Sequence, residues 1–509
     1  MAKKKSDASR STSDDSTGKP PKSKKAAKAA KVNSASTAAP TGKNSAAAPT
    51  GQKNPVPTSP RSAEQIAVTA TGPRPIPDLS SASTTVHPDL VTRVIGNGLR
   101  VIAVRKSGTP LIEVRLRVPF GGTTAAHAAR AELLAATLLL GTEARSRTQV
   151  DAELAMVGGD LDASVDPQRL GITGSVLSTG LPVLLDVLAQ SLTEPAFRRH
   201  DVLGERDRLV EHLAIAASQP SVVARQYLQE RRFGTHPVTR EMPDAAAVAG
   251  VSAAALRTLQ QKALVPNGST LVMVGDLEPA RAIDQVEVAL AGWKSTATAR
   301  VVQTPNAVRG GAVKAFHRER AVQSQVRLSA AGLERTDPDY PAGQLANLVY
   351  GGYFSSRLVE NIREDKGFTY SAGSSFEFWP SRAAVTVSFD TNSISTAAAL
   401  LEARYELGRL ALGPPSEKEV ESARNYALGT LATSLATQAG YASTLSSLAG
   451  LGLDVEWLRE HPARLAAVTV DEVARVAGSL LAPSAFTGVV VGDLESIGAS
   501  LAVLGEVDL

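Results

Sequence analysis

One helix–turn–strand unit occurs twice in the chain, and this repeat constrains the fold more than any other feature. Residues 251–279 align with residues 468–496 without a gap, and both expected strands run into the pentapeptide Val-Gly-Asp-Leu-Glu. The two copies are 217 residues apart. Such a constant spacing indicates a duplicated domain. We therefore expect two homologous domains of similar size, at residues 85–300 and 301–509.

Strand and helix signals in each expected domain predict an α+β fold. Asn97-Gly98 separates two apolar segments and predicts a β-hairpin. Residues 112–118 alternate between apolar and charged side chains, as a half-buried strand does, and residues 125–140 predict an Ala/Leu helix. Ser416 and Glu419 form a capping box before a long helix. Strands segregated from helices, with several hairpins, predict an α/β sandwich in each domain.

The other expected elements follow from the same patterns. We expect helices to begin near residues 148, 182, 202, 222, 338 and 395, and strands to cover residues 161–165, 170–177, 323–328, 370–378 and 383–390.

The N-terminal residues 1–84 differ in composition from the rest of the chain. Residues 1–75 contain eleven Lys and three Arg against three Asp and one Glu, a net charge of +10. The whole chain carries +4, so the remainder carries −6. Few apolar residues are available to form a core there, and we expect a disordered, solubilising tail. Weak contact of this tail with nucleic acid is the alternative, and nucleic-acid binding elsewhere is not expected.

Composition also limits the compartment and the kinds of site. The chain has no cysteine, which excludes disulfides and thiolate metal sites. No segment is apolar over the length that a membrane span requires, and no apolar region follows the basic start of the chain. We therefore expect a cytoplasmic protein with no membrane span.

The run GGYFSSRLVENIREDKGFTY, residues 351–370, contains the clearest functional motif. Its order Arg-Glu-x-x-Gly-x-x-Tyr places Arg363 seven residues before Tyr370. The pair resembles the substrate-binding arginine and tyrosine of the pitrilysin/insulinase family of zinc metallopeptidases, the inverzincins. Smaller similarities to this family occur at residues 233–237 and 332–340. The resemblance covers most of the chain after the tail and implies two homologous α+β domains.

The same resemblance indicates that the zinc motif of the family is degenerate here. Family members bind zinc through HxxEH on a helix, with the glutamate activating water. The family helix usually ends in Gly-Thr, and counting back from Gly141 places Glu132, Ala135 and Ala136 where His, Glu and His should stand. His127 has no histidine partner four residues on. We expect no metal in this chain.

The third family ligand, a glutamate on a later helix, projects to the neighbourhood of Leu213. Glu211 and His212 lie there. One such group binds zinc too weakly without two partners, because a catalytic site needs three protein ligands. We therefore expect Glu132, Glu211 and His212 to be ordinary solvated helix residues.

These observations predict the non-catalytic, substrate-binding subunit of a heterodimeric zinc metalloendopeptidase. A partner of the same family would supply HxxEH and Zn²⁺, and this chain would supply Arg363 and Tyr370 to bind unfolded peptides. Two alternatives stay open at this point. The chain could be a structural core-type subunit of a larger complex, or a peptide-binding homodimer without protease activity.

Overall fold

The computed structural model describes residues 89–509, and the tail expected at residues 1–84 lies outside them. The first half of the described chain forms a six-stranded mixed sheet in the order β1-β2-β6-β3-β5-β4. β6 runs parallel to β2 and antiparallel to β3. The strands are β1 Leu90–Val94, β2 Arg100–Arg105, β3 Leu111–Pro119, β4 Asp160–Val165, β5 Arg169–Leu177 and β6 Thr270–Gly275.

The predicted hairpin at Asn97-Gly98 joins β1 to β2. The amide of Gly98 donates to the Ile95 carbonyl at 2.8 Å, and Gly98 has a φ of 89°, which disfavours any side chain there. The Asn97 amide group donates to the carbonyls of Leu290 and Trp293, both at 3.1 Å. The turn is therefore fixed by its own glycine and by the segment that follows α9.

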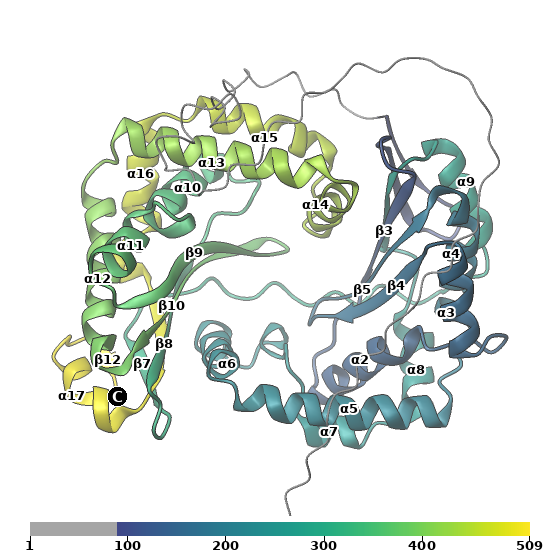
Figure 1. Ribbon diagram of the computed structural model, residues 1–509, viewed down its shortest axis with the longest axis horizontal. Coiled ribbons are helices and arrows are strands. Elements are labelled where there is room, and N and C mark those ends of the chain that lie inside the picture. Colours follow the sequence, from purple (N-terminus) through teal and green to yellow (C-terminus); the bar gives the residue numbers. More distant parts are fainter. Residues whose placement is uncertain (1–88) are drawn as a thin grey trace, which may run out of the picture. The chain divides into compact units, whose positions relative to one another are not determined.

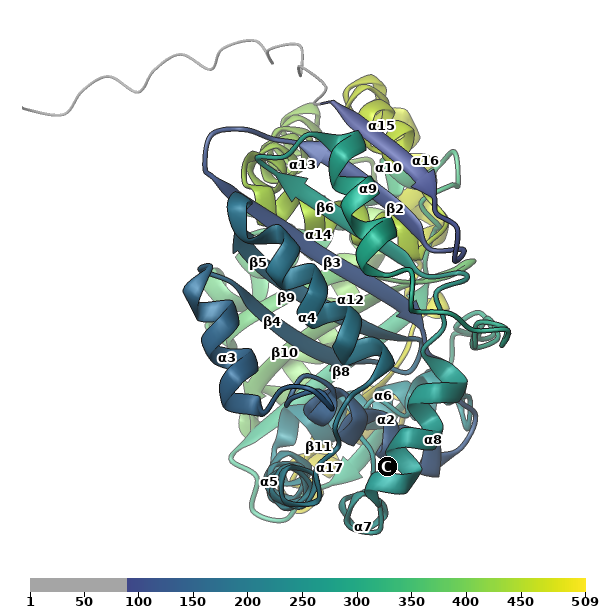
Figure 2. The ribbon, with the colours of Figure 1, turned by 90° about the vertical axis from the view of Figure 1, so that its right-hand side faces the viewer.

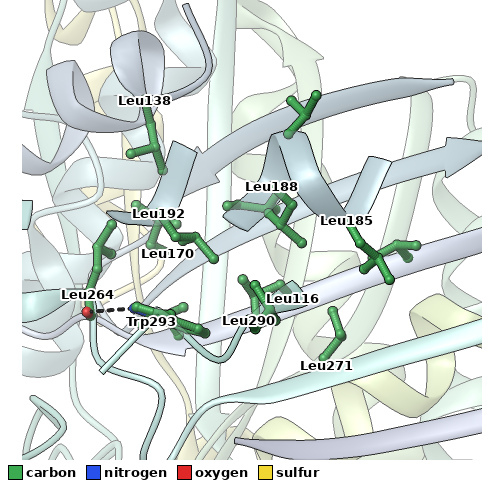
Figure 3. Close-up of a cluster of buried hydrophobic side chains, with 14 of the residues drawn as sticks. Leu116, Leu138, Leu170, Leu185, Leu188, Leu192, Leu264, Leu271, Leu290 and Trp293 are labelled. Atoms are coloured by element: carbon green, nitrogen blue, oxygen red, sulfur yellow. Dashed lines mark hydrogen bonds between the residues drawn. The ribbon is translucent and has the colours of Figure 1, made fainter. Parts of the chain in front are cut away.

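Helices cover one face of this sheet, and Figure 2 looks onto α3, α4 and α9 on that side. Every second residue of β3 is buried, from Ile112 to Val118, as the alternation predicted. Figure 3 shows the leucines that fill the core, where Trp293 donates its indole N–H to the Leu264 carbonyl at 3.1 Å. The helices are α2 Ala125–Leu138, α3 Arg147–Met156, α4 Leu181–Thr193, α5 Arg199–Ser218, α6 Pro220–Phe233, α7 Ala245–Ala249, α8 Ala253–Ala263 and α9 Pro279–Ala289.

The second half repeats this arrangement, with the sheet order β12-β7-β11-β8-β10-β9. β11 is parallel to β7 and antiparallel to β8, so the two Val-Gly-Asp-Leu-Glu strands, β6 and β11, occupy the same place in the two sheets. The duplication and the α+β class are confirmed. The strands are β7 Val313–His317, β8 Gln323–Ala331, β9 Thr369–Trp379, β10 Arg382–Asn392, β11 Thr487–Gly492 and β12 Val507–Asp508.

The capping box of Ser416 and Glu419 is formed as predicted at the start of α13. The helices are α10 Tyr340–Asn347, α11 Arg357–Val359, α12 Thr396–Leu412, α13 Glu417–Ala436, α14 Gln438–Gly450, α15 Val455–Ala467, α16 Val470–Leu480 and α17 Leu494–Ala502. Short 3₁₀ turns lie at Ser178–Gly180, Pro237–Thr239, Ser393–Ser395 and Pro483–Ala485.

Two segments differ from the expected regular helices. The helix expected from residue 338 ends at Asn347 and continues as a π-helical turn, η3, Leu348–Gly352. The segment that carries Arg363 is likewise a π-helical turn, η4, Glu360–Asp365. Wide turns of this kind are frequent at functional sites. The strands β7 and β12 were not predicted.

The two halves exchange equivalent helices. α6 of the first half packs on β8 and β11 of the second sheet, and α14 of the second half packs on β3 and β6 of the first sheet. The contact is polar as well as apolar, because Arg115 of β3 donates to Ser443 of α14 at 3.3 Å and Arg231 of α6 donates to Thr487 of β11 at 3.0 Å. The described residues 89–509 accordingly belong to one compact unit.

No helix within residues 89–509 has both the length and the apolar character needed to cross a bilayer.

Candidate functional site

Arg363 and Tyr370 come together on η4 and the start of β9 (Figure 1 shows β9 beside α11). The guanidinium carbon of Arg363 lies 6.0 Å from the centre of the Tyr370 ring and 4.8 Å from that of Phe354. Tyr370 is 91% exposed and Phe354 62% exposed. A cation between two exposed rings forms a surface that offers hydrogen-bond donors and aromatic faces to a ligand.

A glycine gives this pair its geometry. Gly367 has a φ of 61°, in the region that favours glycine, and its amide donates to the Arg363 carbonyl at 3.2 Å. The next amide, of Phe368, donates to the Ile362 carbonyl at 2.8 Å. The wide turn therefore closes within a few residues, and the chain enters β9 with Tyr370 beside Arg363.

The neighbouring arginine of the motif has a different role. Arg357 makes a two-pronged ion pair with Glu419, with N···O distances of 2.6 and 3.0 Å. The hydrogen bond from Arg357 is the main reason that the pKa of Glu419 is lowered to about 2. Arg357 thus fastens the loop to α13. Among the ion pairs of residues 89–509, Arg363 takes part in one, at 3.4 Å to the adjacent Glu364, and a third of its side chain stays exposed.

The positions that the sequence analysis assigned to a degenerate zinc motif lie elsewhere, on α2. Glu132, Ala135 and Ala136 line a cavity of about 580 Å³ between α2, β4 and α5. His212 of α5 lines the same cavity, whereas Glu211 does not. The methyl groups of Ala135 and Ala136 have no lone pair to offer a metal. The lining of this cavity does not include Arg363 or Tyr370.

Glu132 is half-buried and not fully solvated as the sequence predicted. Burial raises the pKa of its carboxyl group from 4.5 to about 7. Within residues 89–509, the cause of this shift is desolvation of the carboxylate. The side chain differs from the prediction because Glu132 lies with Ala135 and Ala136 on the face of α2 that lines the cavity.

Glu205, the acidic residue of α5 that lines this cavity, forms ion pairs with arginines. Glu205 is 8% exposed and pairs with Arg208, and Arg147 of α3 approaches it to 3.6 Å. The Nε2–H group of His127 donates to the Phe120 carbonyl at 3.0 Å, and burial lowers the pKa of the imidazole. Within residues 89–509, no three His, Asp or Glu side chains are grouped so that they could hold a metal ion.

Sequence reasoning missed Phe354 and Glu205. Phe354 stands in the same run as Arg363, but an exposed aromatic in a loop gives no periodic signal, and only the fold places its ring against the guanidinium. Glu205 carries an acidic side chain in a helix rich in charges, and nothing in the spacing distinguishes it from its neighbours.

Comparison with known proteins relates both halves to one family. Residues 100–245 match the family described as Insulinase (Peptidase family M16), and residues 250–426 match the Peptidase M16 inactive domain.

Curated relatives point the same way. The chain is 28% identical over 242 residues to an uncharacterized zinc protease of Streptomyces coelicolor. The aligned region covers 46% of this chain and about half, 52%, of the length of that relative. An uncharacterized zinc protease of Mycobacterium bovis is 25% identical over 75% of this chain and 89% of its own length. A probable mitochondrial-processing peptidase subunit beta of Arabidopsis thaliana is 21% identical over 52% of this chain and 51% of its length.

Solved structures share the fold. A peptidase M16 inactive domain from Pseudomonas fluorescens superposes with a TM-score of 0.71 at 22% identity, over 80% of this chain and 98% of the other. A protease from Helicobacter pylori has the same TM-score at 16% identity, over 79% and 99% of the two chains. The chain therefore belongs to the peptidase M16 family, also called the insulinase/pitrilysin family.

Proposed function

We propose that this protein is the non-catalytic, substrate-binding subunit of a heterodimeric zinc metalloendopeptidase. A partner of the M16 family supplies HxxEH, its Zn²⁺ and the activated water. The observation that carries the proposal is the contrast between the two sites. Arg363 and Tyr370 lie side by side and accessible, whereas the cavity at the motif position is lined by Ala135 and Ala136.

The chemistry of the Arg363–Tyr370 pair suits a peptide in the course of hydrolysis. A guanidinium offers a rigid fork of donors and a phenol offers one more, and both can stabilise the oxygen of a carbonyl that becomes an oxyanion. Such donors accelerate hydrolysis only when a zinc-bound hydroxide attacks from the opposite side. In the proposed complex that hydroxide belongs to the partner.

An unfolded peptide can add to a sheet edge beside the degenerate cavity. β4 is the last strand of the first sheet, and its residues Asp160, Asp162 and Ser164 are exposed while the alternate residues are partly covered. An unpaired strand edge binds extended peptides through main-chain hydrogen bonds, which require little sequence preference. This supports a subunit that handles unfolded substrates.

The relatives include proteins named as alpha and beta subunits of a mitochondrial-processing peptidase. A probable mitochondrial-processing peptidase subunit alpha-2 of Arabidopsis thaliana matches 26% of this chain, alongside the beta subunit already described. A paired M16 partner is therefore the partner that we propose.

Co-expression with an HxxEH-containing M16 chain tests the proposal. The pair should co-purify, and the complex, but not this chain alone, should cleave an unfolded peptide in a zinc-dependent manner. A larger assembly without cleavage would favour the structural-subunit alternative, and a homodimer that ignores the partner would favour the peptide-binding alternative.

Substitutions separate the role of the pair from assembly. Arg363→Ala should lower kcat of the complex about 10²- to 10³-fold, the usual loss for one donor to an oxyanion, without changing assembly. Arg206→Ala is the matched control, because Arg206 also pairs with an adjacent acid, Asp207, and is not among the residues that line the cavity. Full cleavage by the double variant of Arg363 and Tyr370 would disprove the contact role.

A further inference from the structure

Residues of α10, α13, α14 and α15 line a separate cavity of about 390 Å³ in the second half. It contains neither the Arg363–Tyr370 pair nor the degenerate motif, and the proposed function does not use it. Its rim carries the exposed hydroxyl residues Thr430, Ser434, Ser443 and Ser447. Its floor is apolar, because Leu448, Leu458 and Leu465 are buried.

One cation dominates this cavity. The guanidinium carbon of Arg335 lies 4.3 Å from the ring centre of Phe378, 5.2 Å from that of Trp457 and 5.6 Å from that of Tyr340. Three aromatic rings hold the arginine in one orientation.

The guanidinium of Arg335 has no anionic partner. Among the residues that the structure describes, none of the ion pairs involves it, and its buried Nε has no hydrogen-bond acceptor. The lining contains no Asp or Glu. By contrast, Arg357 and Arg475 of the same half each grip a carboxylate with two nitrogens. A partly enclosed guanidinium without an acceptor is costly and favours an anion.

His461, which also lines this cavity, has a buried ring nitrogen without a hydrogen-bond partner among the described residues. His461 is 3% exposed and its Nε2 lies 2.9 Å from Oε1 of Gln344, while its Nδ1 has no partner. Burial, together with the charge of Arg335, lowers the pKa of His461 to about 4, so the imidazole is neutral at pH 7. The cavity therefore presents one positive charge, neutral hydroxyl donors and an apolar floor.

We propose that this cavity binds the carboxylate group of a peptide, with Arg335 as the anion-binding residue and the leucine floor holding the adjoining apolar side chain. The proposal rests on the proposed function only in naming a peptide as the carrier of the carboxylate. The carboxylate can be the free carboxyl terminus or an acidic side chain, because both present the same two oxygens to a guanidinium.

Peptide binding to the purified full chain, without any partner, tests the proposal. An N-acetylated leucine-rich hexapeptide without a dye is compared in three forms by isothermal titration calorimetry. The first has a free carboxyl terminus, the second is amidated and carries no charge, and the third is amidated with one Glu near its end. The uncharged form should bind at least tenfold more weakly than one of the other two, which identifies the source of the carboxylate.

Variants assign the binding to the cavity. Arg335→Met keeps the packing among the rings but removes the charge, and should weaken binding of the carboxylate form about 10- to 100-fold. Lys418→Met is the control, because Lys418 is an exposed cation of α13 outside the cavity. Ser447→Phe fills the cavity from an exposed position and should abolish binding without touching Arg335.

Equal binding of all three peptide forms, or unchanged binding by both Arg335→Met and Ser447→Phe, would overturn the proposal. If Arg335→Met does not fold, Ser447→Phe and the comparison of the peptide forms decide the matter. Because cleavage is not measured, a failure of the proposed protease role, seen with Arg363→Ala in the complex, is distinguishable from a failure here.

Discussion

The carboxyl group of Glu132 should make the stability of this protein depend on pH, and Glu132→Gln should remove that dependence. Burial raises its pKa from 4.5 to about 7 in the folded state. The folded state therefore holds a proton that the unfolded state releases near pH 4.5. The contribution of the protonated Glu132 to the free energy of unfolding is fully present below pH 4.5. It is lost as the pH rises through 7, because the buried carboxyl group must then ionise.

The size of the effect follows from the pKa values. A change from 4.5 to about 7 corresponds to at most about 3 kcal/mol above pH 7, and partial exposure of the side chain reduces this to about 2–3 kcal/mol. At pH 5 the same reasoning leaves less than about 1 kcal/mol. For a folded unit of roughly 420 residues, 2–3 kcal/mol corresponds to about 2–3 °C in Tm.

Differential scanning calorimetry at pH 5 and pH 8 measures this difference. Glu132→Gln should melt about 2–3 °C above the wild type at pH 8 and close to it at pH 5. Glu211→Gln, an exposed position on α5, is the control and should follow the wild type at both pH values. A Glu132→Gln variant that changes Tm equally at the two pH values would refute the argument, because packing rather than charge would then be responsible.

Three further predictions concern the packing of the two halves and the motif loop. The side chain of Arg232 on α6 is 1% exposed and pairs with Glu377 of β9 at 2.8 Å. Glu377→Ala should leave this charge buried without a partner and lower the free energy of unfolding, measured in urea, by about 3–5 kcal/mol. A loss below about 1 kcal/mol would contradict this reasoning. When the segments 85–300 and 301–509 are expressed separately, they should be insoluble, because α6 and α14 each cover the sheet of the other half. Co-expression of the two segments should restore solubility. Separate halves that are folded and monomeric would show that the exchange of helices is dispensable. Gly367→Ala should lower the free energy of unfolding by about 1 kcal/mol because Gly367 has a positive φ, although the added methyl group meets no neighbouring atom. The same substitution should lower kcat of the proposed complex by moving Tyr370. An unchanged kcat would mean that the turn does not set the geometry of the pair.

Much of the local structure could be predicted because it depends on nearest neighbours. The alternation in β3, the Asn97-Gly98 hairpin and the capping box of Ser416 each arise from residues a few positions apart. The spacing of the Val-Gly-Asp-Leu-Glu repeats also predicted correctly that β6 and β11 are equivalent.

The candidate site was predictable only in part. The order of Arg363 and Tyr370 identified the pair, and the structure places the two side chains together. The burial of Glu132 and the contact of Phe354 with Arg363 depend on which helix or loop faces them, and the chain order does not contain that information. The unpaired charge of Arg335 was hidden for the same reason, since an arginine in a loop usually finds water or an acid.

The sequence by itself determined the duplicated α+β plan and the presence of the Arg363–Tyr370 motif. Only the tertiary structure decided that the halves exchange α6 and α14, and that Arg335 lines a cavity without a carboxylate partner among residues 89–509. The physical reason is that backbone patterns reflect local hydrogen bonding and burial of one face, whereas pairing of charges and helix exchange depend on contacts between residues far apart in the chain.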